Sequence, residues 1–176
     1  MAMFLSAGKI RYILIFLAFL LLSAGTFSPW DIDEIVGKKA PDFTLKDVSG
    51  RDVAFASFKG RAVLINFWAT WCPSCRSEMP ALNRLGKELR GRGLAVIAVS
   101  ADRSAETVKD YLMKNPLDFP ILVDQDSRVA RQFKVFSLPT SFLVDRNGSI
   151  LYRFLGEEEW NSPEMLEKIN RALGSQ

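Results

Sequence analysis

Residues 62–80 read AVLINFWATWCPSCRSEMP, and the interpretation of the whole chain starts from this stretch. Its first part, residues 62–68, is β-branched and aromatic and too short for a helix, so it predicts a buried strand. Apolar residues then recur at steps of three and four over residues 79–89, with charges between them, which predicts an amphipathic helix. The only two cysteines of the chain, Cys72 and Cys75, therefore stand where a strand passes into a helix.

The position of the cysteines at the start of this helix favours redox chemistry. Pro73 suits the first helical position, where its fixed φ fits and its missing N–H would have had no partner. Cys72 is then the N-cap, and its sulfur lies beside the free backbone N–H groups of Ser74 and Cys75. These donors and the helix dipole favour an anion, so we expect a lowered pKa for the Cys72 thiol. The pattern indicates a dithiol that alternates between thiolate attack and disulfide closure.

Three other roles for the two cysteines stay open at this point. A structural disulfide would close a very small loop, so it would remove little chain entropy and add little stability. A zinc site needs about four ligands, whereas the chain has two cysteines and no histidine. The cysteines could also be buried and unreactive. The preceding strand, Pro73 and the adjacent Trp71 favour the redox role over these alternatives.

The composition excludes several other classes of function. The 176 residues allow one domain with a sizeable core, in addition to a distinct N-terminal segment. Lysine and arginine are scattered and the net charge is +3, so no nucleic-acid surface is expected. The absence of histidine removes Ser-His-Asp and Cys-His catalysis and most metal sites. We therefore expect neither a metal nor an organic cofactor.

The rest of the chain alternates between strand and helix patterns. Residues 40–54 predict a hairpin that extends one edge of the sheet, and residues 141–154 predict a second hairpin whose turn contains Asn147-Gly148. The other predicted elements are a strand over 94–100, a helix over 105–114, a strand over 119–123, a short helix over 127–133 and a helix over 163–173. Strands that alternate with helices, followed by a hairpin and a helix, predict a mixed α/β three-layer sandwich.

The segment from Phe67 to Pro80 resembles the active-site segment of the thioredoxin superfamily. Among its branches it is most similar to the membrane-anchored, extracytoplasmic thiol–disulfide oxidoreductases of the TlpA, ResA and CcmG type, which have a redoxin (AhpC/TSA-like) domain. The similarity extends from about Gly37 to the C-terminus and includes the N-terminal hairpin. It implies a thioredoxin-like three-layer α/β/α sandwich with a central mixed sheet, and a redox-active disulfide between Cys72 and Cys75.

The resemblance also implies roles for residues outside the cysteine motif. Pro139 matches a proline that is cis in the superfamily and faces the cysteines, and Leu138 before it would offer backbone hydrogen bonds to an incoming peptide. Glu78 lies one turn after Cys75, where proteins of the ResA type carry a glutamate that tunes the cysteines and helps to move protons. The alternative for Glu78 is a solvated carboxylate, which is favourable near a helix N-terminus.

Asn66 departs from the superfamily, in which thioredoxin itself usually has a buried aspartate at this point of the strand. A neutral amide does not take up the proton of the second cysteine, so the base would be Glu78, water or the partner's leaving thiolate. We expect Trp68 and Trp71 to belong partly to the core and partly to the rim of the site. An apolar surface that includes Trp71 and Pro73 would suit docking of a partner polypeptide.

Residues 1–27 are of a different kind from the rest of the chain. Two basic residues precede an uncharged apolar run over residues 12–27, which as a helix would span about 24 Å at about 1.5 Å per residue. We expect a single-pass signal-anchor in the cell membrane, and the alternative is a signal peptide whose cleavage leaves a secreted or periplasmic protein. Residues 28–39 are expected to be a linker and residues 40–176 the thioredoxin-like domain. Both alternatives place this domain on the extracytoplasmic (periplasmic) side.

The expected function is thiol–disulfide exchange with partner proteins, with this protein as the reductant. Cys72 attacks a partner disulfide, Cys75 resolves the mixed disulfide, and a membrane electron donor restores the dithiol. By resemblance the partners are extracytoplasmic proteins, with the haem-binding cysteines of apocytochrome c as a plausible case. The alternatives are a thiol peroxidase of peroxiredoxin type, for which Thr70 and Arg76 are present, and a membrane-tethered binding module whose cysteines only staple a loop.

Overall fold

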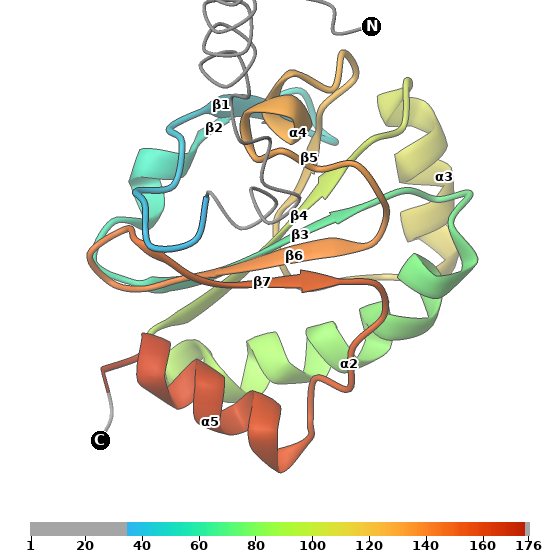
Figure 1. The fold of residues 1–176 in the computed structure, drawn as a ribbon. Helices are drawn as coiled ribbons and strands as arrows, with labels where there is room; N and C mark the ends of the chain where they lie inside the picture. The colour runs from blue at the N-terminus through green and yellow to red at the C-terminus, as the bar shows by residue number, and fades with distance from the viewer. Residues whose placement is uncertain (1–34, 175–176) are drawn as a thin grey trace, which may run out of the picture. The chain divides into compact units, whose positions relative to one another are not determined.

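The apolar strand that precedes the cysteines lies near the middle of a seven-stranded mixed sheet (Figure 1). The structure is a computed structural model, and it describes residues 35–174. Its strands are β1 (Thr44–Asp47), β2 (Asp52–Ala54), β3 (Ala62–Trp68), β4 (Leu94–Ser100), β5 (Ile121–Val123), β6 (Thr140–Val144) and β7 (Ile150–Leu155). The helices are α2 (Pro73–Leu89), α3 (Ala105–Lys114), α4 (Arg128–Gln132) and α5 (Pro163–Ala172), with 3₁₀ turns η2 (Phe55–Phe58) and η3 (Arg90–Arg92).

The strand order is β2-β1-β5-β4-β3-β6-β7. The three inner strands β3, β4 and β5 are parallel, and the remaining pairings are antiparallel. Every residue of β3 and of β4 is buried, as expected for parallel strands that are covered on both faces. The N-terminal hairpin extends the sheet through β1, which pairs with β5, so the prediction of an edge hairpin is confirmed.

Two apolar clusters, one on each face of the sheet, make the core. The first cluster packs β3 and β4 against α2, α3 and α5, and contains the cysteines. The second lies under α4, η2 and residues 35–43, and four phenylalanines with ring centroids 5.2–5.9 Å apart form its centre: Phe43, Phe67, Phe133 and Phe142. The predicted three-layer sandwich is therefore confirmed.

Side-chain caps start the helices where the sequence predicts them. The Ser104 hydroxyl accepts a hydrogen bond from the Glu106 amide at 3.2 Å at the start of α3. The Ser162 hydroxyl accepts one from Met165 at 3.2 Å at the start of α5, and Pro163 occupies the first helical position. Each cap satisfies a backbone N–H that has no partner within its own helix.

The packed part of the domain begins before residue 40. Ile35 is buried in the second cluster, the Gly37 amide donates to Ile150 at 2.8 Å, and the Ile150 amide donates to Lys38 at 2.9 Å. Of the linker expected over residues 28–39, the described part is thus hydrogen bonded to β7. The anchor expected over residues 1–27 lies outside the described residues. Within residues 35–174, no helix is both long and apolar enough to cross a membrane.

Replacement of Phe133 tests the aromatic centre of the second cluster. Phe133 is fully buried, so Phe133→Ala is expected to lower the free energy of unfolding by about 3–5 kcal/mol, because it leaves a cavity among three other rings. Phe136, three residues later, is 83% exposed, and Phe136→Ala is expected to change the same quantity by less than about 0.5 kcal/mol. Urea unfolding curves of the two variants measure both values. Equal losses would contradict the assignment of Phe133 to the core.

Candidate active site

The turn between β3 and α2 brings both sulfur atoms to the N-terminus of α2. Cys72 is the N-cap with extended backbone angles, and Pro73 occupies the first helical position, as the sequence predicts. The Cys75 amide donates a hydrogen bond to the Cys72 sulfur at 3.3 Å. The Ser74 hydroxyl lies 3.6 Å from the same sulfur. An anion on Cys72 would therefore meet a hydrogen-bond donor and the positive end of the helix dipole.

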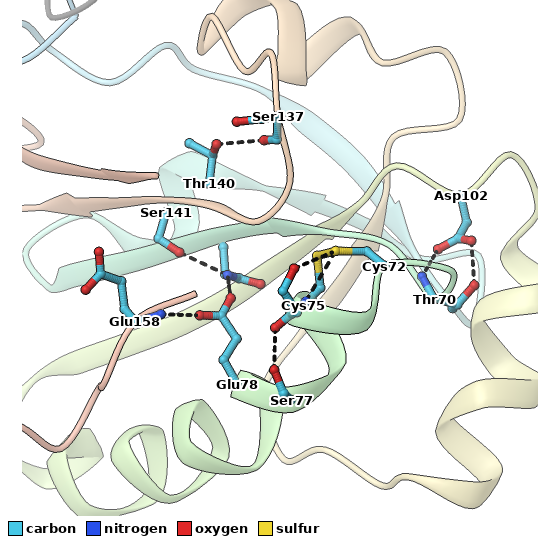
Figure 2. Close-up of a disulfide and its surroundings, with 12 residues drawn as sticks. Thr70, Cys72, Cys75, Ser77, Glu78, Asp102, Ser137, Thr140, Ser141 and Glu158 are labelled. Carbon is cyan, nitrogen blue, oxygen red and sulfur yellow. Dashed lines mark hydrogen bonds between the residues drawn. A yellow bond between two sulfur atoms is a disulfide. The ribbon is translucent and has the colours of Figure 1, made fainter. Parts of the chain in front are cut away.

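The two cysteines form a disulfide, with their Cα atoms 5.3 Å apart (Figure 2). Cys72 keeps 5% of its surface exposed, whereas Cys75 is fully buried. The pair is thus asymmetric, with Cys72 as the sulfur that a partner can reach first. This asymmetry agrees with the expected roles of Cys72 as the attacking thiol and Cys75 as the resolving thiol.

The two tryptophans that flank the turn differ in environment. Trp71 is 67% exposed beside Cys72, as expected for a residue on the rim of the site. Trp68 is fully buried, and its ring packs on Tyr111 with a centroid distance of 5.3 Å. The expectation that Trp68 contributes to the rim is therefore wrong. As the last residue of β3, it points into the first cluster, because that face of the strand is covered by helices.

Leu138 and Pro139 lie next to the same end of β3. The peptide bond between them is cis, as the resemblance implies. Thr140, which follows, pairs with Phe67 of β3, and Leu138 packs against the cluster that contains both cysteines. The Pro139 carbonyl accepts a hydrogen bond from Gly156 at 2.9 Å. Among the described residues the main chain of Leu138 makes no hydrogen bond, so its N–H and C=O are available to a partner.

Glu78 is a buried carboxylate with three hydrogen-bond donors around it. Its side chain is 2% exposed, so the alternative of a solvated surface carboxylate is wrong. Asn66 Nδ2 donates to Oε1 at 2.8 Å, and Trp160 Nε1 donates to Oε2 at 2.9 Å. The Glu158 amide also donates to Oε2, at 3.3 Å. Figure 2 shows this carboxylate on one side of the disulfide, with Thr70 on the other.

Burial raises the pKa of Glu78 above its usual value, and the nearby charge of Glu157 adds to the shift. The hydrogen bonds from Trp160, Asn66 and Glu158 favour the ionised form and oppose the shift. A carboxyl group with a raised pKa holds its proton to higher pH than a carboxyl group at the surface, which suits it to act as a proton donor or acceptor. Because Glu78 lies one helical turn after Cys75, that chemistry would act close to the resolving sulfur.

Asn66 links the carboxylate to the sheet. Its amide nitrogen donates to Ser141 of β6 at 2.9 Å in addition to Glu78. The Asn66 Oδ1 atom is buried and has no hydrogen-bond partner among the described residues. An unpaired buried acceptor is costly unless a water or a proton donor reaches it. Asn66 therefore holds Glu78 in place and leaves an unfilled hydrogen-bond acceptor beside it.

A second buried carboxylate, Asp102, holds the turn before Cys72. Thr70 donates to it twice, from its amide to Oδ2 at 2.9 Å and from its hydroxyl to Oδ1 at 2.7 Å. The Ser100 hydroxyl donates to Oδ2 at 2.7 Å. These bonds tie the end of β4 to the turn that carries the cysteines (Figure 2).

Sequence reasoning missed both Asp102 and Trp160. Asp102 could have been found, because an acidic residue directly after a buried parallel strand is placed at the edge of the sheet where active sites occur. Trp160 gives no such signal. It is far from Glu78 in sequence, and only the return of the chain after β7 brings its N–H to that carboxylate.

A shallow hollow of about 560 Å³ adjoins the exposed side of the site. Trp71 and Leu138 line it together with Phe136, which is 83% exposed. Two large apolar side chains, Trp71 and Phe136, are thus exposed together in the wall of one hollow. Among the described residues, no cluster of cysteine, aspartate and glutamate side chains could hold a metal ion.

Comparison with known proteins agrees with this geometry. Residues 36–153, more than half of the chain, match the AhpC/TSA family. The chain belongs to this family. Within it, the thiol-disulfide oxidoreductase ResA of Bacillus cereus is 37% identical over 152 residues, which make up 86% of each chain. The thioredoxin-like protein YneN of Bacillus subtilis is 41% identical over 128 residues, which make up 71% of this chain and 74% of YneN.

A solved structure of another thiol:disulfide interchange protein shows the same fold. A putative thiol:disulfide interchange protein DsbE from Chlorobium tepidum superposes with a TM-score of 0.74 at 33% sequence identity. The match covers 79% of this chain and 98% of the DsbE chain. The fold is therefore thioredoxin-like, and this AhpC/TSA-family protein is a thiol–disulfide oxidoreductase that carries its disulfide at Cys72 and Cys75.

Glu78→Gln tests the buried carboxylate through the pH dependence of stability. Because folding raises the pKa of Glu78, the native state binds more protons than the unfolded state between the two pKa values. The stability of the unaltered protein should therefore fall as the pH rises through this window, and Glu78→Gln should lack that fall. Glutamine has one acceptor oxygen, so at low pH the variant should lose about 1–3 kcal/mol. Urea unfolding at a series of pH values measures both effects, and parallel pH curves would contradict a raised pKa.

Proposed function

We propose that the protein is an extracytoplasmic disulfide reductase that passes two electrons from a membrane donor to partner proteins. The Cys72 thiolate attacks a partner disulfide, forms a mixed disulfide and releases one partner thiolate. Cys75 then loses its proton and attacks Cys72, which frees the second partner thiolate and closes the Cys72–Cys75 disulfide. The partner gains two electrons, and the donor restores the dithiol. No metal or organic cofactor takes part in this exchange.

The observation that carries this proposal is the asymmetric position of the two sulfurs at the start of α2. Cys72 lies at the helix cap, with the Cys75 amide directed at its sulfur and 5% of its surface exposed. Cys75 is fully buried. A thiolate is the nucleophile in disulfide exchange, and a helix N-terminus stabilises it. A purely structural disulfide would need neither of these features.

We infer the direction of electron flow from the acidic groups near Cys75, which oppose the stabilisation of thiolate that the helix N-terminus gives to Cys72. When Glu78 is ionised, it disfavours a second negative charge on the neighbouring sulfur. Conditions that disfavour thiolate favour the disulfide, and a dithiol that is readily oxidised is a good reductant. The adjacent loop adds the carboxylates of Glu157, Glu158 and Glu159, and the Glu158 amide contacts Glu78 itself. We therefore infer a reducing role.

Partner recognition would use the hollow beside Cys72. Trp71 and Phe136 offer exposed rings, and the unpaired main chain of Leu138 offers one donor and one acceptor to an extended segment. This arrangement suits a polypeptide whose disulfide lies in an exposed loop. Extracytoplasmic proteins with disulfides are the proposed partners, and apocytochrome c, with two cysteines to be reduced before haem attachment, is one case.

The proposed location rests on the sequence of residues 1–27. Their apolar run would anchor the chain in the cell membrane as a single-pass segment, or would direct it out of the cytoplasm and then be cleaved. Outside the cytoplasm a dithiol is oxidised unless it is supplied with electrons. A membrane electron donor is therefore part of the proposal.

A disulfide reductase and a peroxidase can be told apart by their turnover. In the structure the Thr70 hydroxyl is bound to Asp102 rather than directed at a sulfur, which does not favour the peroxidase alternative. The full chain, supplied with a dithiol reductant, is expected to reduce insulin disulfides and to reduce hydrogen peroxide no faster than the reductant alone. Cys72→Ser should lower insulin reduction to the uncatalysed rate, because the nucleophile is lost. Rapid peroxide turnover, or insulin reduction that persists in Cys72→Ser, would contradict the proposal.

A resolving-cysteine variant should capture the partners. In Cys75→Ala the mixed disulfide cannot be resolved, so partners are expected to stay covalently bound to Cys72 in cells that express the full chain. Non-reducing gels followed by mass spectrometry identify them. The matched control is Cys72→Ala, in which the remaining Cys75 is buried and should capture none. Equal capture by both variants would contradict the assigned order of attack.

A further inference from the structure

A face rich in basic side chains lies at the end of the domain opposite the disulfide. Two adjoining hollows, of about 280 Å³ and about 430 Å³, share Phe58 and Arg61 in their walls. The cationic residues that line them, or that contact a lining residue directly, are Lys39, Lys59, Arg61, Lys87, Arg90, Arg92 and Arg146. We call these residues the basal basic face.

The topology separates this face from the cysteines by the length of the domain. Its hollows are lined by the starts of β3 and β4 and by the turn between β6 and β7, whereas the cysteines follow the far end of β3. Helix α2 runs between the two ends (Figure 1). With 17 residues it is about 25 Å long. Its first turn carries the disulfide, and its last turn carries Lys87.

Most of these cations are bound to uncharged acceptors, so their charge is not neutralised. The guanidinium of Arg61 donates to the Leu94 carbonyl at 2.8 Å, and that of Arg146 donates to the Arg92 carbonyl at 3.0 Å. Three further cations also donate hydrogen bonds to uncharged acceptors. Lys39 donates to the Asn147 carbonyl and the Ser149 hydroxyl, Arg90 to the Asp118 carbonyl and Arg92 to the Asn170 side-chain oxygen.

Three carboxylates share these hollows, and each already has partners. Asp118 accepts an ion pair from Lys87 at 2.7 Å. Asp145 Oδ1 accepts the backbone amides of Asn147 and Ser149, and Asp42 Oδ1 accepts that of Phe43. Six cations and three carboxylates therefore line the two hollows, which leaves an excess of positive charge at this end of the domain.

Residues 37–40 run along the same end of the domain as the basal basic face. The Gly37 amide donates to Ile150, and the Ala40 amide donates to Gly148 at 2.9 Å, so residues 37–40 run beside the turn between β6 and β7. Residues 28–34 separate the apolar run from the described domain, and at full extension they span at most about 25 Å. If residues 1–27 lie in a bilayer, this short connection limits how far the domain can move from the lipid surface.

We propose that the basal basic face binds the anionic phospholipid headgroups of the membrane that anchors the chain. This inference rests on the proposed function, because it requires the membrane attachment proposed for residues 1–27. Each lysine or arginine close to an anionic lipid surface adds roughly a fivefold gain in binding. Contact through several such residues therefore orients the tethered domain while remaining reversible.

The orientation points the disulfide away from the lipid. The acidic loop of Glu157, Glu158 and Glu159 lies near the disulfide, as the contact between the Glu158 amide and Glu78 shows. Like charge repels this loop from an anionic surface. The bound domain thus presents Cys72 to partners in the aqueous phase, and its release from the lipid lets it turn toward a membrane donor.

Energy transfer from Cys72 to the lipid surface tests this orientation. The full-length Cys75→Ser chain, labelled on its single cysteine with a donor dye, is reconstituted in vesicles that carry acceptor dye on their headgroups. The vesicles are phosphatidylcholine alone, or phosphatidylcholine with about 30% phosphatidylglycerol. We expect lower transfer in the anionic vesicles, because the labelled cysteine is held away from the surface, and equal transfer once about 0.5 M salt screens the charges.

Charge-reversal variants supply the control. Lys59→Glu combined with Arg146→Glu should remove the difference between the two kinds of vesicle. Lys109→Glu combined with Lys114→Glu makes the same change in net charge, but on the exposed face of α3. This variant should keep the difference in energy transfer between the two kinds of vesicle. Made in the chain with both cysteines, each pair should retain insulin reduction, which shows that it folds.

Several outcomes would overturn the orientation. These are equal transfer in the two vesicles at low salt, higher transfer in the anionic vesicles, and loss of the difference in the Lys109 and Lys114 variant. If energy transfer in neutral vesicles instead decreases as the protein density on the vesicle rises, the basal basic face would be assigned to contact with a second copy of the chain. A full chain that does not float with neutral vesicles would contradict the anchor and the orientation together, while insulin reduction would still report on the proposed chemistry.

Discussion

The structure depends on one junction, where the buried strand β3 ends and the N-terminus of α2 begins. The hydrogen bond from the Cys75 amide to the Cys72 sulfur exists because Pro73 starts the helix and leaves Cys72 at its cap. The strand fixes the position of this cap, since it is paired on both sides and fully buried. The sheet thus positions the Cys72 sulfur at the N-terminus of α2, where the helix dipole stabilises an anion.

The surroundings of this junction divide into an open apolar side and a buried side that holds a carboxyl group. On the exposed side, Trp71 and the cis Leu138–Pro139 segment border an open hollow. On the buried side, Glu78 is enclosed by donors, and burial raises its pKa. A carboxyl group in such an environment keeps its proton to higher pH than a surface carboxylate does. Asn66 of β3 has no titrating group. The carboxyl group of Glu78 on α2 is therefore the available base near Cys75.

The two ends of α2 differ in charge as well as in chemistry. The end with the disulfide adjoins three consecutive glutamates, and the other end belongs to the basal basic face. This difference in charge is the basis of the orientation proposed for the domain on an anionic surface.

The sequence by itself determined the elements of the fold and the chemistry of the cysteines, because these follow from local patterns. Apolar periodicity predicted β3 and α2, and Pro73 after Cys72 predicted the cap. The environment of Glu78 depends on the tertiary structure, since its donors come from Asn66 of β3 and from Glu158 and Trp160 in the loop after β7. The tertiary structure also decided that Trp68 is core while Trp71 is rim, although both are tryptophans within one short segment. Burial depends on which elements cover a residue, and that is a property of long-range packing rather than of the neighbouring sequence.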